Sequence, residues 1–388
     1  MRLNPLPQSV YTDRINRLQQ KLQQANIDLF IGYSSECESA TSRYLCGFWP
    51  FFDFCAVMVP AQGTAALVTG GPESYEFALS FAKSVDIYIN PLLVETSAPD
   101  WVTDAPGQDF KNIIKKVCSS APLRIGLGNQ NIFPYPLMEE LKKASPHSEI
   151  ISADSLLLDI QSLKTDVEIP YIIEAYKIAE KSLIASLQTA QVGKREWELE
   201  AKARSEMLLL GAEGTPYPPW VCSGDNTRLS LCRSTDKPIQ LNELVQLTIG
   251  TKYMGFCGNM CRPFSLGKFP PGAKKLADVA LEAINYVLAT IRPGMESWRL
   301  FKGYYNILSK YGYQEYTLYG PAHGTGSSEV EGLWLSEKSN FIIKPNMLFN
   351  IDIWLSDHEH GLRYEDGILI TDQGVKELTS YRREVIEI

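Results

Sequence analysis

The chain has 388 residues, of which 45% are hydrophobic and 21% are charged, and its formal net charge is −8. This length gives room for two domains, or for one large domain with a sizeable core. The acidic balance excludes nucleic acid and anionic membrane surfaces as expected partners, because both require a basic footprint.

The N-terminus carries no continuous apolar segment of the secretory type, and no stretch reaches the roughly 18–20 uninterrupted apolar residues of a membrane span. The eight cysteines are scattered and form no disulfide framework. Cys257 and Cys261 are spaced C-x3-C, but no second pair completes a zinc site. We therefore expect a cytoplasmic protein with reduced thiols.

The first part of the chain alternates between helical and extended patterns. Helical periodicity is expected at 10–28, starting near Asp13, and at 73–84, 109–121 and 135–146. Strand patterns fall at 29–33, 54–70 (a hairpin), 85–92, 124–129 and 148–154. This alternation predicts an N-terminal α/β domain, residues 1–158.

The remainder, residues 159–388, has a different texture. Two long helices are expected at about 167–192 and 195–211, and a helix pair at about 272–291 and 296–311. Hairpins fill the rest. The stretch "ELVQLTIGTKYMGFCGNMCRPFSLG", Glu243–Gly267, predicts a β-hairpin in which Gly250 and Gly255 mark the turn region.

Three stretches of this second half together resemble the creatinase/prolidase/methionine-aminopeptidase family, whose members have the pita-bread fold. They are the hairpin at 243–267, "GPAHGTGSSEVEG" at 320–332, and the closing run "KPNMLFNIDIWLSDHEHGLRYEDGILITDQGVKELT" at 344–379. A weaker likeness lies in "SRYLCGF" at 42–48. The resemblance implies an α/β N-terminal domain followed by an α+β pita-bread domain, in which helices back a curved antiparallel sheet. It also implies a homodimer.

Metallopeptidases of this family bind two metal ions through five side chains. The resemblance places them at Thr248, Asn259, His323, Asp352 and Glu365. Thr and Asn are neutral and weak ligands for hard cations, so a two-metal cluster is not expected. His323, Asp352 and Glu365 remain as possible ligands of a single ion, although Asp352 is one methylene shorter than the Glu of the family.

The histidines that handle protons in the peptidases are also missing. Leu231 and Val330 stand in their places. A metal-free hydrolase needs its own acid and base, as creatinase illustrates. The expected catalytic residues, which the motifs bring to one floor, are His323, Glu331, Asp352 and Glu365.

Substrate-binding residues are expected in two regions. Thr248, Asn259, Arg363 and Arg233 belong to the motifs of the second half, and Arg363 can bind a carboxylate or orient Glu365. The segment "CGFWPFFDFC" at 46–55 adds Phe52 and Asp53, which family members supply across the dimer interface. His358 and His360 are expected to be loop residues near the site.

These expectations combine into one leading hypothesis. It is a metal-independent enzyme without a cofactor that hydrolyses a non-peptide C–N bond of a small nitrogen-containing metabolite, as creatinase and ectoine hydrolase do. Two alternatives stay open. One is a mononuclear metallohydrolase or Xaa-Pro-type peptidase that uses His323, Asp352 and Glu365. The other is a catalytically inactive pita-bread module that binds a partner.

Overall fold

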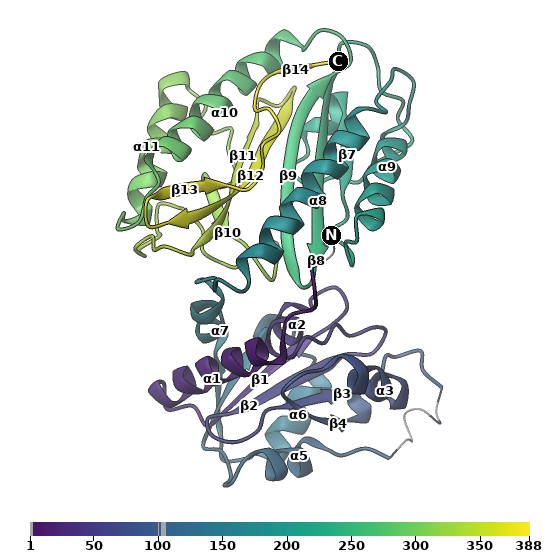
Figure 1. The fold of residues 1–388 in the computed structure, drawn as a ribbon, viewed down its shortest axis with the longest axis vertical. Helices are drawn as coiled ribbons and strands as arrows, with labels where there is room; N and C mark the ends of the chain where they lie inside the picture. Colours follow the sequence, from purple (N-terminus) through teal and green to yellow (C-terminus); the bar gives the residue numbers. More distant parts are fainter. Residues whose placement is uncertain (1–2, 100, 102–105) are drawn as a thin grey trace. The chain divides into compact units, whose positions relative to one another are not determined.

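The computed structural model describes residues 3–99, 101 and 106–388, which form two compact units (Figure 1). One unit is 4–161, and the other is 162–388 together with Leu3. The predicted fold class, an α/β unit followed by an antiparallel sheet backed by helices, is confirmed. Among the described helices, none has the length and hydrophobicity that a membrane span requires.

The N-terminal unit is built on a six-stranded mixed sheet of order β4-β3-β2-β1-β5-β6. Its strands are β1 Leu29–Ser34, β2 Cys55–Pro60, β3 Ala66–Thr69, β4 Asp86–Ile89, β5 Arg124–Gly128 and β6 Glu149–Ser152. Its helices are α1 Gln8–Gln24, α2 Ala40–Cys46, α3 Pro72–Phe81, α5 Phe110–Val117, α6 Tyr135–Ala144 and α7 Asp154–Gln161, with short 3₁₀ turns at η1 Pro91–Leu93 and η2 Gln130–Ile132.

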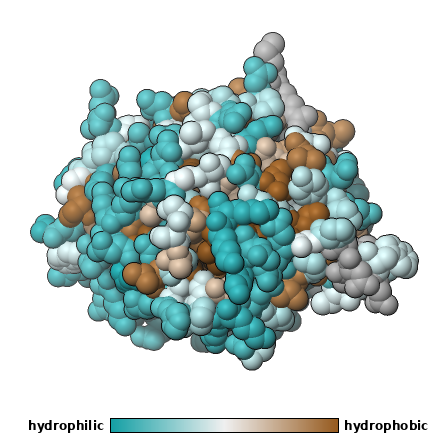
Figure 2. All heavy atoms as spheres, turned by 90° about the horizontal axis from the view of Figure 1, so that it is seen from below, coloured by the Kyte–Doolittle hydropathy of each residue, from teal (hydrophilic) through white to brown (hydrophobic). Residues whose placement is uncertain are grey.

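The inner strands β1, β2, β3 and β5 are buried on both faces of the sheet, which explains why they are largely apolar. On β1, Phe30 belongs to one core cluster, whereas Leu29 and Ile31 belong to another on the opposite face. On the face of the molecule seen in Figure 2, hydrophobic residues lie in small groups among hydrophilic ones.

Three helices of this unit differ from the sequence expectation. Helix α1 begins at Gln8, directly after the extended Pro7, and not near Asp13. Its first turns are stabilised by packing, because Tyr11 and Arg14 are buried there. Helices α2 and α7 were not predicted. They have only seven and eight residues, too short for a clear period in the sequence.

The C-terminal unit is built on an eight-stranded sheet of order β10-β11-β12-β9-β8-β7, in which β13 pairs with β12 and β14 with β9. Its strands are β7 Trp220–Ser223, β8 Leu244–Tyr253, β9 Phe256–Ser265, β10 Ala322–Gly324, β11 Leu348–Ser356, β12 Gly361–Thr371, β13 Gly374–Glu377 and β14 Ile386–Glu387. Its helices are α8 Ile169–Leu187, α9 Glu196–Leu209, α10 Pro271–Thr290 and α11 Ser297–Tyr311, with a 3₁₀ turn η3 Gly224–Arg228. Helix α8 packs on β8 and β9, whereas α10 packs on β11 and β12 (Figure 1).

Of the two glycines expected to mark the β8–β9 turn, only Gly255 lies in it. Tyr253 pairs with Phe256, so the turn is Met254–Gly255, and both residues have positive φ (50° and 88°). That conformation suits a two-residue hairpin turn. Gly250 lies inside β8, where a Cβ atom would come within 2.8 Å of the Tyr217 ring. It serves close packing and not the turn.

The strand register fixes the floor of the C-terminal unit. Thr248 pairs with Cys261, Cys261 with Glu365, and Glu365 with Asp352. Directly opposed residues of an antiparallel pair point to the same face of the sheet and lie about 4.5–5.5 Å apart at Cβ. Four residues from four strands therefore form one transverse row, and all four are buried.

Behind this row lies Arg262, which has no exposed surface. Its guanidinium donates to the Glu365 carbonyl at 3.0 Å and to Asp366 Oδ1 at 2.7 Å. It also donates to the carbonyls of Tyr381 and Arg382. One buried cation thus joins β9, β12 and the C-terminal segment.

Removal of one partner of this ion pair is expected to destabilise the C-terminal unit strongly. Asp366→Ala leaves the buried Arg262 uncompensated, and such losses cost about 3–5 kcal/mol. Urea unfolding measures this cost. The matched control is Glu296→Ala, which removes an exposed pair with Arg299 and should cost at most about 1 kcal/mol. Equal effects of the two substitutions would contradict the assignment.

Candidate active site

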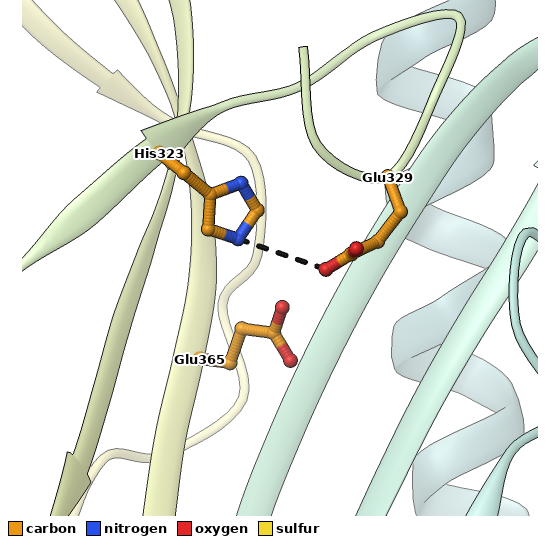
Figure 3. A group of neighbouring side chains, drawn as sticks. All are labelled: His323, Glu329 and Glu365. Carbon is orange, nitrogen blue, oxygen red and sulfur yellow. Dashed lines mark ion pairs between the residues drawn. The ribbon is translucent and has the colours of Figure 1, made fainter. Parts of the chain in front are cut away.

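Three ionisable side chains converge on the floor of the C-terminal unit (Figure 3). His323 lies on β10, Glu365 lies on β12, and Glu329 lies in the loop that follows β10. Each offers one ligand atom, and these atoms all lie within 4.8 Å of one another. His323 and Glu365 are each 1% exposed. The cluster therefore brings Glu365 beside two residues that lie 36 and 42 positions earlier in the sequence.

His323 is oriented by its own backbone neighbourhood. Its Nδ1 lies 3.0 Å from the Gly324 carbonyl, so this nitrogen carries the proton and donates. The lone pair of Nε2 then faces Glu329 Oε1 at 3.7 Å (Figure 3). Two ligands that each lie about 2.0–2.2 Å from a tetrahedral zinc ion are separated by roughly 3.2–3.6 Å. The observed separation is close to this spacing.

The conformation of the loop after β10 places Glu329, and not Glu331, next to His323. Glu331 forms a buried ion pair with Lys164 and accepts hydrogen bonds from the backbone and hydroxyl of Ser327. Its carboxylate is therefore used in holding the loop. Glu329, which sequence reasoning missed, is the acid that joins the cluster. Gly326 permits this path, because its φ is +155° and a Cβ atom there would meet Lys164 and Glu331.

Asp352 is engaged by a different partner. Its Oδ2 accepts from Arg363 Nη1 at 2.9 Å, and both side chains are buried. Arg363 Nη2 also donates to the Ser230 carbonyl at 3.1 Å. Asp352 is thus neutralised by Arg363 and is absent from the three-residue cluster. The structure therefore shows Arg363 pairing with Asp352 and not with Glu365.

Glu365 is held from one side only. Its Oε1 accepts from Asn350 Nδ2, and Asn350 in turn accepts from the Tyr176 hydroxyl at 2.6 Å. Its Oε2 is buried and has no hydrogen-bond partner among the described residues. An anionic oxygen in this position requires a proton or a cation.

Electrostatics agree with this geometry. Burial raises the pKa of Glu365 well above its usual range, and the neighbouring carboxylate of Asp352 raises it further. Burial likewise raises the pKa of Glu329. Two carboxyl groups thus resist ionisation near His323, as is common at functional sites.

Two neutral side chains, Thr248 and Asn259, occupy the positions at which the family resemblance places two aspartate ligands. The Thr248 hydroxyl lies 3.0 Å from the Cys261 thiol. Both polar atoms of the Asn259 amide are buried without a partner among the described residues. Neither side chain offers an anionic oxygen, so the residues present do not fit a two-metal cluster. His323, Glu329 and Glu365 do fit one divalent ion.

Aromatic side chains surround the cluster. Trp334 lies 5.1 Å from His323 and stacks on Tyr319 at 5.8 Å. Tyr217 lies 5.2 Å from Trp220, and its buried hydroxyl has no partner among the described residues. Burial raises the pKa of Tyr217 well above its usual range, and the nearby charge of Glu365 adds to this effect. Sequence reasoning missed these residues, because no motif marks them.

Other predicted residues lie outside the cluster. Asp53 accepts from the Gly71 and Glu95 backbones and from the Ser74 hydroxyl, so its carboxylate is used within the N-terminal unit. Phe52 is 71% exposed. Arg233 is also exposed, at the surface of the C-terminal unit.

His358 and His360 occupy the loop between β11 and β12. His358 has a positive φ of 74°. The backbone of His360 donates to Asp357 Oδ1 at 2.8 Å. Both positions are consistent with a loop role.

Comparison with known proteins identifies the family. Residues 171–372 match metallopeptidase family M24, and residues 14–160 match the creatinase/prolidase N-terminal domain. The chain belongs to metallopeptidase family M24. An Xaa-Pro dipeptidase of Pyrococcus horikoshii is 27% identical over 85% of this chain and 94% of its own length. An Xaa-Pro dipeptidase of Pyrococcus furiosus is 29% identical over 67% of this chain and 75% of its own length.

Solved structures of this family share the whole fold. The prolidase of Pyrococcus horikoshii superposes with a TM-score of 0.82 over 96% of this chain and 100% of its own, at 24% identity. The X-Pro aminopeptidase of Thermotoga maritima gives a TM-score of 0.80 over 96% and 99%, at 22% identity.

These comparisons correct the leading hypothesis from the sequence. A metal-independent hydrolase of non-peptide C–N bonds is wrong, because the chain belongs to a metallopeptidase family and its relatives named here are Xaa-Pro dipeptidases. The expectation that the chain is a creatinase-like or ectoine-hydrolase-like member is also wrong, because the relatives named here are Xaa-Pro dipeptidases. The hypothesis rested on the neutral Thr248 and Asn259 at two ligand positions, and the family assignment overturns it.

The raised pKa of Glu365 predicts an unusual stability change. The folded state binds this proton more tightly than the unfolded state, so the carboxyl group destabilises the metal-free protein increasingly as pH rises above its usual value of about 4.3. Glu365→Gln removes that penalty and keeps the shape. After chelator treatment, we expect the variant to melt at a higher temperature than the wild type at pH 8. Each kcal/mol of unfolding free energy that the substitution recovers raises the melting temperature by about 2–4 °C, and the difference should be smaller at pH 5.

Differential scanning calorimetry of both proteins across this pH range measures the gap. The matched control is Glu337→Gln, which changes an exposed carboxylate and should leave the melting temperature unchanged. A variant that melts below the wild type at every pH would contradict the prediction.

Proposed function

We propose that the chain is a metal-dependent peptidase that cleaves short peptides, with one divalent cation bound by His323, Glu329 and Glu365. The observation that carries this proposal is the convergence of their three ligand atoms within 4.8 Å on the floor of an M24 fold. The unpartnered Oε2 of Glu365 and the lone pair of His323 Nε2 support it independently.

The charge around the cluster favours one ion. Glu329, Asp352 and Glu365 contribute −3 when ionised, and Arg363 contributes +1, which leaves −2 with a neutral His323. A single divalent cation balances this charge. Two cations would leave an uncompensated charge of +2 in a buried site, which is strongly unfavourable. The neutral Thr248 and Asn259 account for the difference from a two-metal site.

A divalent cation held by His323, Glu329 and Glu365 would supply Lewis acidity to a peptide carbonyl oxygen. The chain's own residues bind and orient the peptide. The Tyr217 hydroxyl, whose raised pKa keeps it protonated, donates a hydrogen bond to a substrate oxygen. Arg363 Nε is buried without a partner among the described residues, and a peptide carboxylate would satisfy it.

An Xaa-Pro dipeptide is the substrate class that this site favours. The stacked rings of Tyr319 and Trp334 offer a flat apolar surface beside His323, on which a proline ring can pack. The relatives named Xaa-Pro dipeptidases support the same class. Leu231 and Val330 replace the proton-handling histidines of the peptidases, and Leu231 is 70% exposed. The protonated Tyr217 hydroxyl supplies a hydrogen-bond donor in their place.

The activity test measures proline release from Ala-Pro, with Ala-Ala as the comparison, in the presence of Mn²⁺, Co²⁺ or Zn²⁺. We expect faster cleavage of Ala-Pro, loss of cleavage in His323→Ala, and a decrease of about 10²–10³ in kcat for Tyr217→Phe. Glu337→Gln is the unchanged control. Absence of dipeptide cleavage with every cation would overturn the proposed function.

The number of bound ions tests the charge argument separately from activity. Metal analysis after dialysis is expected to give one equivalent for the wild type and much less than one for Glu329→Gln. The double substitution Thr248→Asp with Asn259→Asp adds two carboxylates and should raise the value toward two equivalents. A wild type that binds two ions, or a Glu329→Gln variant that binds one as tightly, would contradict the ligand assignment.

A further inference from the structure

A buried ion pair lies at the base of the loop that carries Glu329. Lys164 Nζ contacts Glu331 Oε2, and the two side chains are only 4% and 2% exposed. The two residues are 167 positions apart in the sequence. Neither is a member of the cluster of His323, Glu329 and Glu365, so the pair has no part in the proposed ligand set. Its role must lie in what it holds in place.

The position of Lys164 is fixed by its backbone. Lys164 N donates to the Asn346 carbonyl at 2.8 Å, and the preceding Leu163 forms a bridge with Met347. Asn346 and Met347 directly precede strand β11. The ammonium group of Lys164 is therefore carried by a segment that is tied to the sheet, and it meets the loop from a fixed point.

Glu331 passes this constraint on to the loop. Its Oε1 accepts from Ser327 N at 2.6 Å and from Ser327 Oγ at 2.9 Å, while its backbone N donates to the Gly324 carbonyl at 2.9 Å. Its Oε2 is held by Lys164, which fixes the orientation of the carboxylate. The backbone also packs closely on the pair at Gly326, where a Cβ atom would meet both side chains. One carboxylate thus joins the two ends of the segment 327–331.

Glu329 lies in the middle of this segment and depends on it. Its side chain is 29% exposed, and its partner is His323 Nε2 at 3.7 Å. In the described part of the chain, no hydrogen bond to another side chain or to the backbone holds the Glu329 carboxylate. Metal ligands are usually oriented by hydrogen bonds from the surrounding residues. Here the path of the backbone must do this, so the position of the loop decides where the Glu329 carboxylate lies.

We propose that the Lys164–Glu331 ion pair positions Glu329 beside His323 and thereby sets the affinity of the site for its divalent cation. This inference rests on the proposed function, because it takes Glu329 as a ligand. Lys164 and Glu331 are positioning residues that act through Glu329. Loss of residues that support metal ligands lowers metal affinity by about 10–100-fold.

Replacing both partners of the pair tests the proposal. Lys164→Met with Glu331→Leu leaves no unpaired buried charge, and such apolar replacements are commonly tolerated by the fold. Calorimetric titration of the full-length protein with Mn²⁺ should show a Kd about 10–100-fold above that of the wild type. In a Glu329→Gln background, the same double substitution should weaken binding no further. Lys274→Met with Asp278→Leu removes an exposed pair on α10 and is the matched control, with an unchanged Kd.

Hydrogen exchange of the metal-free protein tests the loop itself. The Lys164→Met/Glu331→Leu variant should exchange the amides of residues 325–331 faster than the wild type, the Ser327 amide above all, because that amide loses its acceptor. The control pair on α10 should leave this exchange unchanged. Unchanged exchange in the loop, an unchanged Kd, or equal weakening with and without Glu329 would each overturn the proposal.

The two measurements separate this proposal from the proposed function. A wild type that binds no Mn²⁺ overturns the proposed function, and the exchange of the metal-free loop still decides whether Lys164 and Glu331 hold it. If the double variant fails to fold, Ser327→Ala gives the same comparison. It removes only the hydroxyl bond to Glu331, so a smaller rise in Kd is expected, again absent in the Glu329→Gln background.

Discussion

The C-terminal unit depends on how it compensates two carboxyl groups that its sheet register forces together. Asp352 and Glu365 are directly paired across β11 and β12, and both are buried. Like charges in such positions repel, and burial adds the cost of desolvation. Arg363 neutralises Asp352, which leaves Glu365 with a hydrogen bond on one oxygen and none on the other. The fold therefore contains a carboxylate that needs a proton or a cation.

Arg363 can neutralise Asp352 only because the position of its guanidinium is fixed. Its second amino group donates to the carbonyl of Ser230, in a segment whose two ends are held by the buried carboxylate of Glu196. Behind the sheet, Arg262 donates to the Glu365 carbonyl and to Asp366. The charged residues of the floor are thus held on one side by the segment that contains Ser230, and on the opposite face of the sheet by Arg262. This arrangement explains why several buried charges coexist in one unit without leaving Glu365 free to move.

The fold, and His323 and Glu365 of the cluster, could be predicted from the sequence through local periodicity and through the likeness of three stretches to a known family. The hairpin at 243–267 and the alternation of strands and helices in the first half are visible as periodicity. The choice between Glu329 and Glu331 is not, because it depends on a buried Lys164 distant in sequence. For the same reason, Tyr217 could not be found: Gly250 makes room for its ring, and no spacing rule records that contact.

The substitution of two aspartates by Thr248 and Asn259 has a simpler physical meaning than the loss of metal chemistry. The two aspartates would carry a charge of −2, which balances one divalent ion. Without them, the site has enough negative charge to balance one ion and not two. The three remaining carboxylates (−3) and Arg363 (+1) together carry a charge of −2, and Glu329 lies in the loop beside His323. On the proposed ligand assignment, a site of this family would change its metal count by changing the floor while the His323 side keeps its ligands. In this view, the relevant variable is the net charge of the buried cluster and not the number of family ligand positions that are filled.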